Sequence, residues 1–220
     1  MRIRLIRIVL KRTPAQLIIP IVAAYVVLPA IGIMSYQSSG VSESLDLMIY
    51  ATQVFLPICS LLWPMAYMQM WVDDDCVETL ISCNHRHKSC LGELLVLYLG
   101  YMTMLLLPFV AFCIVYGFVP LEYVRVGIQC LFAMATLYAA TQLLKNVTLG
   151  SLPIITYLFI CVCFSGNPDF QLLSIIKSIR INSLHELASD YTVYVFVAVL
   201  LLYVSAILGK CHYTQVKRKR

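Results

Sequence analysis

The sequence predicts an all-α integral membrane protein with six transmembrane helices and both termini in the cytoplasm. Apolar residues make up 61% of its 220 residues and charged residues only 12%, whereas a soluble domain has roughly 45–50% apolar and about 25% charged residues. Six runs of the chain contain no Asp, Glu, Lys or Arg. Each run is close to or above the roughly 20 residues that a helix needs to cross the hydrocarbon core. A soluble monomer could not cover itself with so little charge, and a disordered chain would be poor in apolar residues.

The charge-free runs are interpreted as helices because they lack the period-2 alternation of a membrane β-barrel strand. The tails and loops between them are too short for an extramembrane domain, so we expect residues 1–220 to form a single transmembrane domain. The expected spans cover about residues 15–35, 48–71, 92–117, 125–144, 148–165 and 191–209.

The orientation of the spans follows from the distribution of Lys and Arg over the loops. With an even number of spans, both tails, the loop after the second span and the turn after the fourth lie on one side. These segments hold 13 of the 16 basic residues, and Arg125, Lys177 and Arg180 fall on the other side. The basic side is cytoplasmic, so we expect a multi-pass protein of a bacterial cell membrane. The net charge of +5 is then a topology signal, and no nucleic-acid partner is expected.

The sequence of residues 1–12 predicts an amphipathic helix that lies on the cytoplasmic leaflet of the lipid bilayer. Basic residues at positions 4, 7 and 11 share one face, and apolar residues at positions 3, 6 and 10 share another. The basic face is attracted to anionic headgroups.

The loop after the second span predicts a short cytoplasmic helix over residues 73–88. Acidic residues begin it and basic residues end it, an order that suits the helix dipole. Apolar residues at 77, 80 and 81 form one face. Four acids lie within 73–78, next to an anionic leaflet, so docking onto a cytoplasmic partner explains the segment better than lying among the headgroups. The residues expected to dock are Asp74, Asp75, Val77, Glu78, Leu80, Ile81 and Arg86.

Residues 168–189 predict two short external helices that lie at or dip into the outer membrane face before the last span. Asn167 and Pro168 are typical of a helix start, and apolar residues at 172, 175, 176 and 179 follow with helical spacing. Ser183 and Glu186 match a capping box that begins the second helix. A simple interfacial hairpin fits the same pattern.

The expected spans contain no ionisable group at mid-depth, although ion-coupled carriers usually have one. Their polar residues more often bind neighbouring helices than a substrate. The candidates for lining a substrate pathway are Gln53, Thr103, Gln129 and Thr136.

The cysteines and histidines of the cytoplasmic loop raise two other possibilities. Zinc sites pair C-x₂₋₄-C with a second pair of ligands, whereas Cys76 and Cys83 are seven positions apart, so no metal site is expected. A Cys nucleophile beside His85 or His87 would instead make the chain a six-span membrane peptidase that processes a small peptide. The glycine pair that precedes the histidine in such peptidases is missing, and we expect no catalytic residue.

Taken together, these features resemble the permease subunits of the type-2 ABC exporter family. The layout matches over the whole chain: six spans, cytoplasmic ends, an N-terminal amphipathic helix, a coupling helix after span two and short re-entrant helices before span six. The local match covers residues 77–82, then Arg86, then residues 92–95. Cys76 stands where glycine is usual, no proline follows Ser82, and Glu93 replaces a lysine.

The resemblance implies the membrane-spanning subunit of an ATP-driven exporter, with residues 73–88 as its coupling helix. The chain has no G-x-x-x-x-G-K-[ST] loop. ATP and Mg²⁺ would therefore sit on two cytoplasmic ATP-binding subunits, and this chain would be neither an enzyme nor a cofactor carrier. A second permease, identical or similar, would complete the dimer. The lack of charge in the spans favours an amphipathic cargo such as a peptide, antibiotic, drug or lipid. A substrate-binding subunit of a vitamin importer, also small and six-span, is a further alternative.

Overall fold

The regular structure of this protein is helical throughout the part that the structure describes. The computed structural model describes residues 14–39, 41–72, 91–116, 120–165, 167, 170, 173–177, 180–181 and 183–218, and these contain no strand. In chain order the helices are α2 (Pro14–Val22), η1 (Ala23–Val27), α3 (Leu28–Ser39), α4 (Val41–Ser60), α5 (Leu62–Val72), α7 (Leu91–Tyr116), α8 (Pro120–Leu144), α9 (Val147–Cys163) and α10 (Leu184–Arg218).

Five helical segments among the described residues are long and apolar enough to cross a membrane, as a helical membrane protein requires. They are Pro14–Gln37, Glu43–Gln69, Leu91–Val115, Pro120–Leu144 and Leu184–Leu208. The expected fifth span corresponds to α9, which has only 17 residues. At about 1.5 Å per residue, α9 is about 26 Å long, somewhat less than the roughly 30 Å hydrocarbon core. The count of six spans and the cytoplasmic placement of the termini therefore stay predictions.

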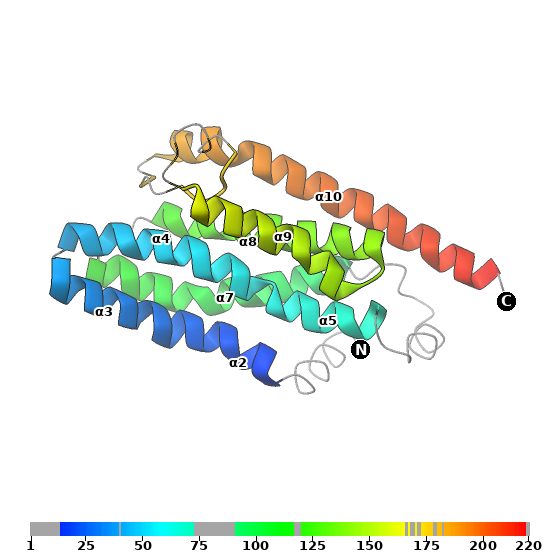
Figure 1. Ribbon diagram of the computed structural model, residues 1–220, viewed down its shortest axis with the longest axis horizontal. Coiled ribbons are helices and arrows are strands. Elements are labelled where there is room, and N and C mark those ends of the chain that lie inside the picture. Colours follow the sequence, from blue (N-terminus) through cyan, green and yellow to red (C-terminus); the bar gives the residue numbers. More distant parts are fainter. Residues whose placement is uncertain are drawn as a thin grey trace.

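The helices run back and forth along one long axis, so their ends gather at two opposite ends of the bundle (Figure 1). One end holds the starts of α4, α8 and α10, and we call it the outer end, after the orientation expected from the basic residues. The inner end holds the end of α5, the start of α7 and the α8–α9 turn. The expected helices over 1–12 and 73–88 lie outside the described residues.

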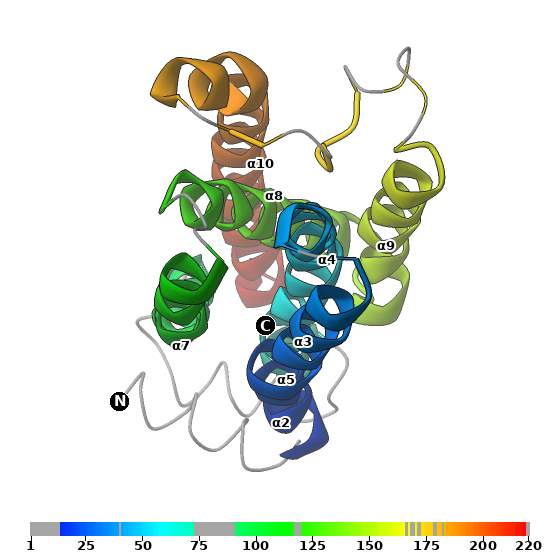
Figure 2. The same ribbon diagram turned by 90° about the vertical axis from the view of Figure 1, so that its left-hand side faces the viewer.

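Helix α8 is the centre of the packing. It contacts α10, α9, α4 and α7, and Figure 2 shows these helices arranged around it. Gly127, Ala133 and Ala135 are among its buried residues, and small side chains allow neighbouring helix axes to approach closely. The side chains of α8 therefore decide how the other spans are placed.

Prolines explain the irregular turns of the first two spans, because each proline removes one backbone donor from its helix. Ahead of Pro29 the chain forms the π-helical turn η1, in which the Leu28 N–H donates to the Ala23 carbonyl five residues earlier. The second span breaks between α4 and α5 at Leu61, which lies between Pro57 and Pro64.

The freed carbonyl groups find partners in side chains. At the break, the Leu61 N–H donates to the Ile58 carbonyl and so leaves the Pro57 carbonyl free, and the Ser60 hydroxyl donates to the Pro57 carbonyl at 2.7 Å. In α7, Pro108 deprives the Met104 carbonyl of its helical donor, and the Tyr25 hydroxyl donates to that carbonyl at 2.7 Å. Because an unpaired carbonyl is costly in hydrocarbon, these hydroxyls stabilise the bends.

The α8–α9 turn brings two backbones into contact. Lys145 adopts a φ of 52°, and the Asn146 side chain caps α9 by accepting from the Leu149 N–H at 2.9 Å. A Cβ on Gly150 would lie 2.5 Å from the Thr141 hydroxyl oxygen and 2.8 Å from its Cα. Only glycine fits at this position without moving the backbone of α8.

We predict that Gly150→Ala destabilises the protein by about 1–3 kcal/mol, because the methyl group overpacks the α8–α9 contact. Gly100→Ala is the matched control. Its Cβ would meet nothing closer than a Trp63 ring carbon at 4.0 Å, and alanine is the better helix former. Thermal unfolding in detergent should show a lower Tm for the first variant only. Equal Tm values for the two variants would contradict the close approach.

We also predict that Tyr25 and Pro108 are energetically coupled. Tyr25→Phe should cost about 0.5–1.5 kcal/mol, because the Met104 carbonyl loses its donor. The same change should cost less in a Pro108→Ala background, where the alanine N–H serves that carbonyl. A double-mutant cycle of unfolding free energies measures the coupling, and strictly additive effects would refute it.

Candidate functional site

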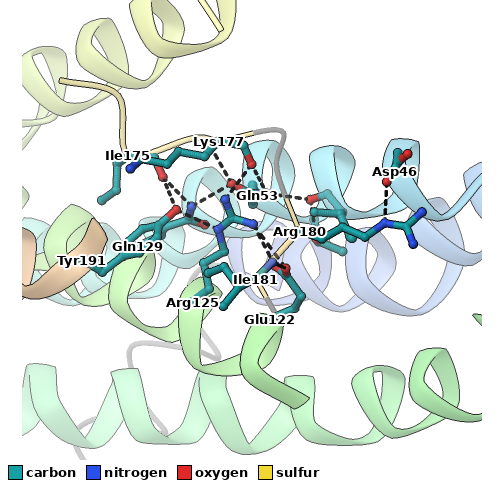
Figure 3. A network of polar contacts seen from close by, with 12 residues as sticks. Asp46, Gln53, Glu122, Arg125, Gln129, Ile175, Lys177, Arg180, Ile181 and Tyr191 are labelled. Carbon is teal, nitrogen blue, oxygen red and sulfur yellow. Dashed lines mark hydrogen bonds and ion pairs between the residues drawn. The ribbon is translucent and has the colours of Figure 1, made fainter. Parts of the chain in front are cut away.

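The outer end of the bundle contains a buried cluster of polar side chains from three helices. Gln53 comes from α4, Glu122, Arg125 and Gln129 from α8, and Tyr191 from α10. They converge on the described residues 173–177 and 180–181, which we call the strap (Figure 3). No other part of the described chain buries an arginine.

The Arg125 guanidinium is the centre of the cluster and is 0% exposed. Its Nη1 donates to Glu122 Oε2 at 3.0 Å, its Nη2 to the Lys177 carbonyl at 2.7 Å, and its Nε to the Tyr191 hydroxyl at 2.7 Å. The Tyr191 hydroxyl in turn donates to the Ile175 carbonyl at 2.9 Å. All three guanidinium nitrogens therefore have acceptors, as a buried charge requires.

Glu122 completes the ion pair from the first turn of α8. Pro120 begins this helix, a position that proline favours because its missing N–H would be unpaired there. A carboxylate in the first turn is stabilised by the helix dipole. Glu122 Oε1 also accepts from the Ile181 N–H at 3.1 Å, so the same carboxylate binds Arg125 and the strap.

Gln53 binds the strap through both the oxygen and the nitrogen of its side-chain amide. Its Oε1 accepts from the Lys177 N–H at 3.0 Å, and its Nε2 donates to the Lys177 carbonyl at 2.9 Å. Gln129 Nε2 donates to Gln53 Oε1 at 3.1 Å and to the Ile175 carbonyl at 2.7 Å. Gln129 Oε1 is buried and has no hydrogen-bond partner among the described residues. The two glutamines thus connect α4, α8 and the strap.

Charged pairs at the rim surround this buried centre. Arg180 Nε lies 2.7 Å from Asp46 Oδ1, and Lys177 Nζ lies 2.9 Å from Asp190 Oδ1. These side chains are partly exposed, so each pair contributes little compared with the buried one. The rim pairs link the strap to α4 on one side and to α10 on the other.

The structure brings together two of the four residues expected along a substrate pathway, Gln53 and Gln129. The Thr103 hydroxyl donates to the Leu99 carbonyl and the Thr136 hydroxyl to the Phe132 carbonyl, each within its own helix. The pathway role of all four stays a prediction. The docking residues expected between 73 and 88 lie outside the described residues.

From the sequence, Arg125 was expected on the outer side, at the start of the span over 125–144, and not as a site residue. It lies inside α8 and is fully buried. Glu122 and Tyr191 were not singled out either. The signal was available: Glu122 and Arg125 stand three positions apart directly after Pro120, a spacing that puts both on one face of a helix start.

The two short external helices expected over 168–189 are not confirmed. Residues 174–177 and 180–181 form no helical turn, because side chains of the spans bind their backbone groups. The expected cap is present, since the Glu186 N–H donates to the Ser183 hydroxyl at 3.2 Å. The helix that it begins is α10, which continues without a break for 35 residues.

Within the described residues, no group of three or more His, Cys, Asp or Glu side chains could hold a metal ion. No protein-family model, curated protein or solved structure matches the chain. Its function is therefore inferred from its residues and their geometry.

We predict that Arg125→Leu destabilises the protein by about 3–5 kcal/mol, because it leaves the Glu122 carboxylate buried without its cation. Adding Glu122→Gln should recover part of that loss. The control Arg180→Leu removes a partly exposed rim pair and should cost about 1 kcal/mol or less. Unfolding titrations in mixed micelles measure all three. Equal costs for the Arg125 and Arg180 variants would contradict the central place of Arg125.

Proposed function

We propose that the chain is the membrane-spanning subunit of a type-2 ABC exporter in the cell membrane. It would move an amphipathic cargo, such as a peptide, antibiotic, drug or lipid, out of the cell. The observation that carries this proposal is the acid-led amphipathic sequence of residues 73–88 between two spans. In a chain without a phosphate-binding loop, this segment offers a docking site for separate ATP-binding subunits.

The placement of the flanking helices supports a docking role. Helix α5 ends at Val72 and α7 begins at Leu91, both at the inner end of the bundle (Figure 1). A partner bound between them would act on two spans at once. These spans touch each other, since the rings of Trp63 in α5 and Tyr101 in α7 pack edge to face with centroids 5.8 Å apart.

The buried cluster at the outer end supports transport over a static anchoring role. Ionisable side chains inside a membrane are costly and usually serve a pathway or a moving part. Here Glu122 and Arg125 are buried where α4, α8 and α10 meet the strap. An exporter needs an input of energy at its inner end and a closure at its outer end. The buried polar cluster would serve as that outer closure.

The surface of α10 is compatible with a second permease or with lipid. Only 17% of its spanning segment is buried within the chain, and Val193, Phe196 and Tyr203 are each about two-thirds exposed. A dimer of permeases in a bilayer would cover such a surface.

We predict that ATPase activity copurifies with the tagged full-length chain from its native membranes in mild detergent. The double variant Glu78→Ala, Leu80→Asp should lose that activity, because it removes one acid and one apolar contact from the docking segment. The matched control is Leu184→Asp, Glu186→Ala, which makes the same changes on exposed residues at the outer end.

The control should retain the ATPase activity of the unchanged chain. The proposal would be overturned if the copurified ATPase activity never exceeds that of a purification with the affinity tag alone. It would also be overturned if the Glu78→Ala, Leu80→Asp variant keeps the activity.

A further inference from the structure

The middle of the strap is buried although most of the strap has no regular structure of its own. Ser174, Ile175 and Ile176 are 0–1% exposed. Side chains of α4, α8 and α10 hold the backbone of Ile175, Lys177 and Ile181 through hydrogen bonds. A segment held in this way exchanges its partners for water as soon as those helices separate.

The attachments fall into two groups of unequal strength. The strap is tied to α8 and α10 through Arg125 and its partners, and breaking that group would leave a charge buried and unpaired. Its buried attachment to α4 is the neutral amide of Gln53, which also pairs with Gln129. Separating α4 from α8 and the strap breaks the neutral hydrogen bonds of Gln53, one rim pair, Asp46 with Arg180, and apolar packing such as that around Ile49 and Cys130, but leaves the buried ion pair intact. The easiest line of opening runs between Gln53 and the rest of the cluster.

Helix α4 is also the outer half of the span that leads to the proposed docking segment. The break at Leu61 separates it from α5, and α5 ends at Val72 beside residue 73. Around the break, the Leu61 N–H reaches back only three residues to the Ile58 carbonyl, and the Tyr101 hydroxyl binds the Leu56 carbonyl. Irregular turns of this kind commonly mark hinges.

We propose that the strap is the outer closure of a pathway between α4 and α8, and that Gln53 is the positioning residue whose withdrawal releases it. In the closed state, the Gln53 amide holds Lys177 and Gln129 together. When α4 moves away from α8, these hydrogen bonds pass to water while the Arg125 group stays intact on α8 and α10. The closure follows from the geometry of the outer end. Only the claim that ATP drives the movement of α4 away from α8 rests on the proposed function.

The native Cys130 allows this closure to be followed by thiol labelling. Cys130 follows Gln129 in α8, is 0% exposed, and contacts the Ser60 hydroxyl of α4. Cys161 in α9 is equally buried, and its thiol lies beside Tyr157 in α9, which also neighbours Tyr194 in α10. Opening between α4 and α8 exposes Cys130, whereas general unfolding exposes both.

The test uses the full chain in cells, with either Cys130 or Cys161 as its sole cysteine, labelled from outside by a membrane-impermeant sulfonated maleimide. Gln53→Met keeps the side-chain volume and removes the hydrogen bonds, so labelling of Cys130 should speed up by about tenfold or more. Gln53→Asn, which keeps the amide, should give an intermediate rate. Thr192→Ala should leave the rate unchanged, because that hydroxyl is exposed and donates to the Ala188 carbonyl within its own helix, α10.

Labelling of Cys161 should stay at its starting rate in every variant. An unchanged Cys130 rate in Gln53→Met would overturn the proposal, and so would a rise at Cys161 as large as that at Cys130. The shorter Gln53→Asn variant keeps the test open if Gln53→Met does not reach the membrane.

The role of ATP is tested separately, in inside-out membrane vesicles that hold the copurifying ATPase, with the maleimide enclosed in the lumen. ATP with vanadate should speed up Cys130 labelling in the unchanged chain, and Gln53→Met should remove that dependence because its strap is already released. A fast Gln53→Met rate without any nucleotide effect would refute the ATP-driven function and leave the closure standing. A nucleotide effect that Gln53→Met does not alter would refute the closure and leave the function standing.

Discussion

The buried guanidinium of Arg125 is the constraint on which the outer end of this protein depends. A charge removed from water needs an acceptor for its donors, and Arg125 finds them on three different segments: Glu122 in its own helix, the Lys177 carbonyl in the strap and the Tyr191 hydroxyl in α10. The path of the strap and the position at which α10 begins its crossing therefore follow from one side chain in α8.

The same rule explains the bends of the spans. Where a carbonyl loses its helical donor, a nearby hydroxyl takes the donor's place: Tyr25 serves Met104, which lost its donor to Pro108, and Ser60 serves Pro57, whose donor is lost at the break at Leu61. In hydrocarbon there is no water to satisfy such groups, so each bend is held by a particular contact. These contacts allow a long apolar helix such as the second span to bend at one point.

The sequence predicted the features that depend on local pattern. Long charge-free runs predicted spanning helices, and Ser183 with Glu186 predicted a helix start, because both depend on residues close together in the chain. The strap was not predictable, since its shape depends on partners as distant as Gln53 and Lys177, which are 124 positions apart. Of the acceptors of Arg125, Glu122 was recognisable from its spacing three positions earlier. The Lys177 carbonyl and the Tyr191 hydroxyl were not, because they lie 52 and 66 positions away in the chain.

Amide hydrogen exchange at the strap tests the central claim most directly. The Lys177 and Ile181 N–H groups donate to Gln53 and Glu122 side chains, and their protection depends on Arg125 holding the cluster together. In nanodiscs, both amides should exchange slowly in the unchanged protein and at the rate of an open loop in Arg125→Leu. Fast exchange in the unchanged protein, or slow exchange that survives the loss of Arg125, would contradict the account.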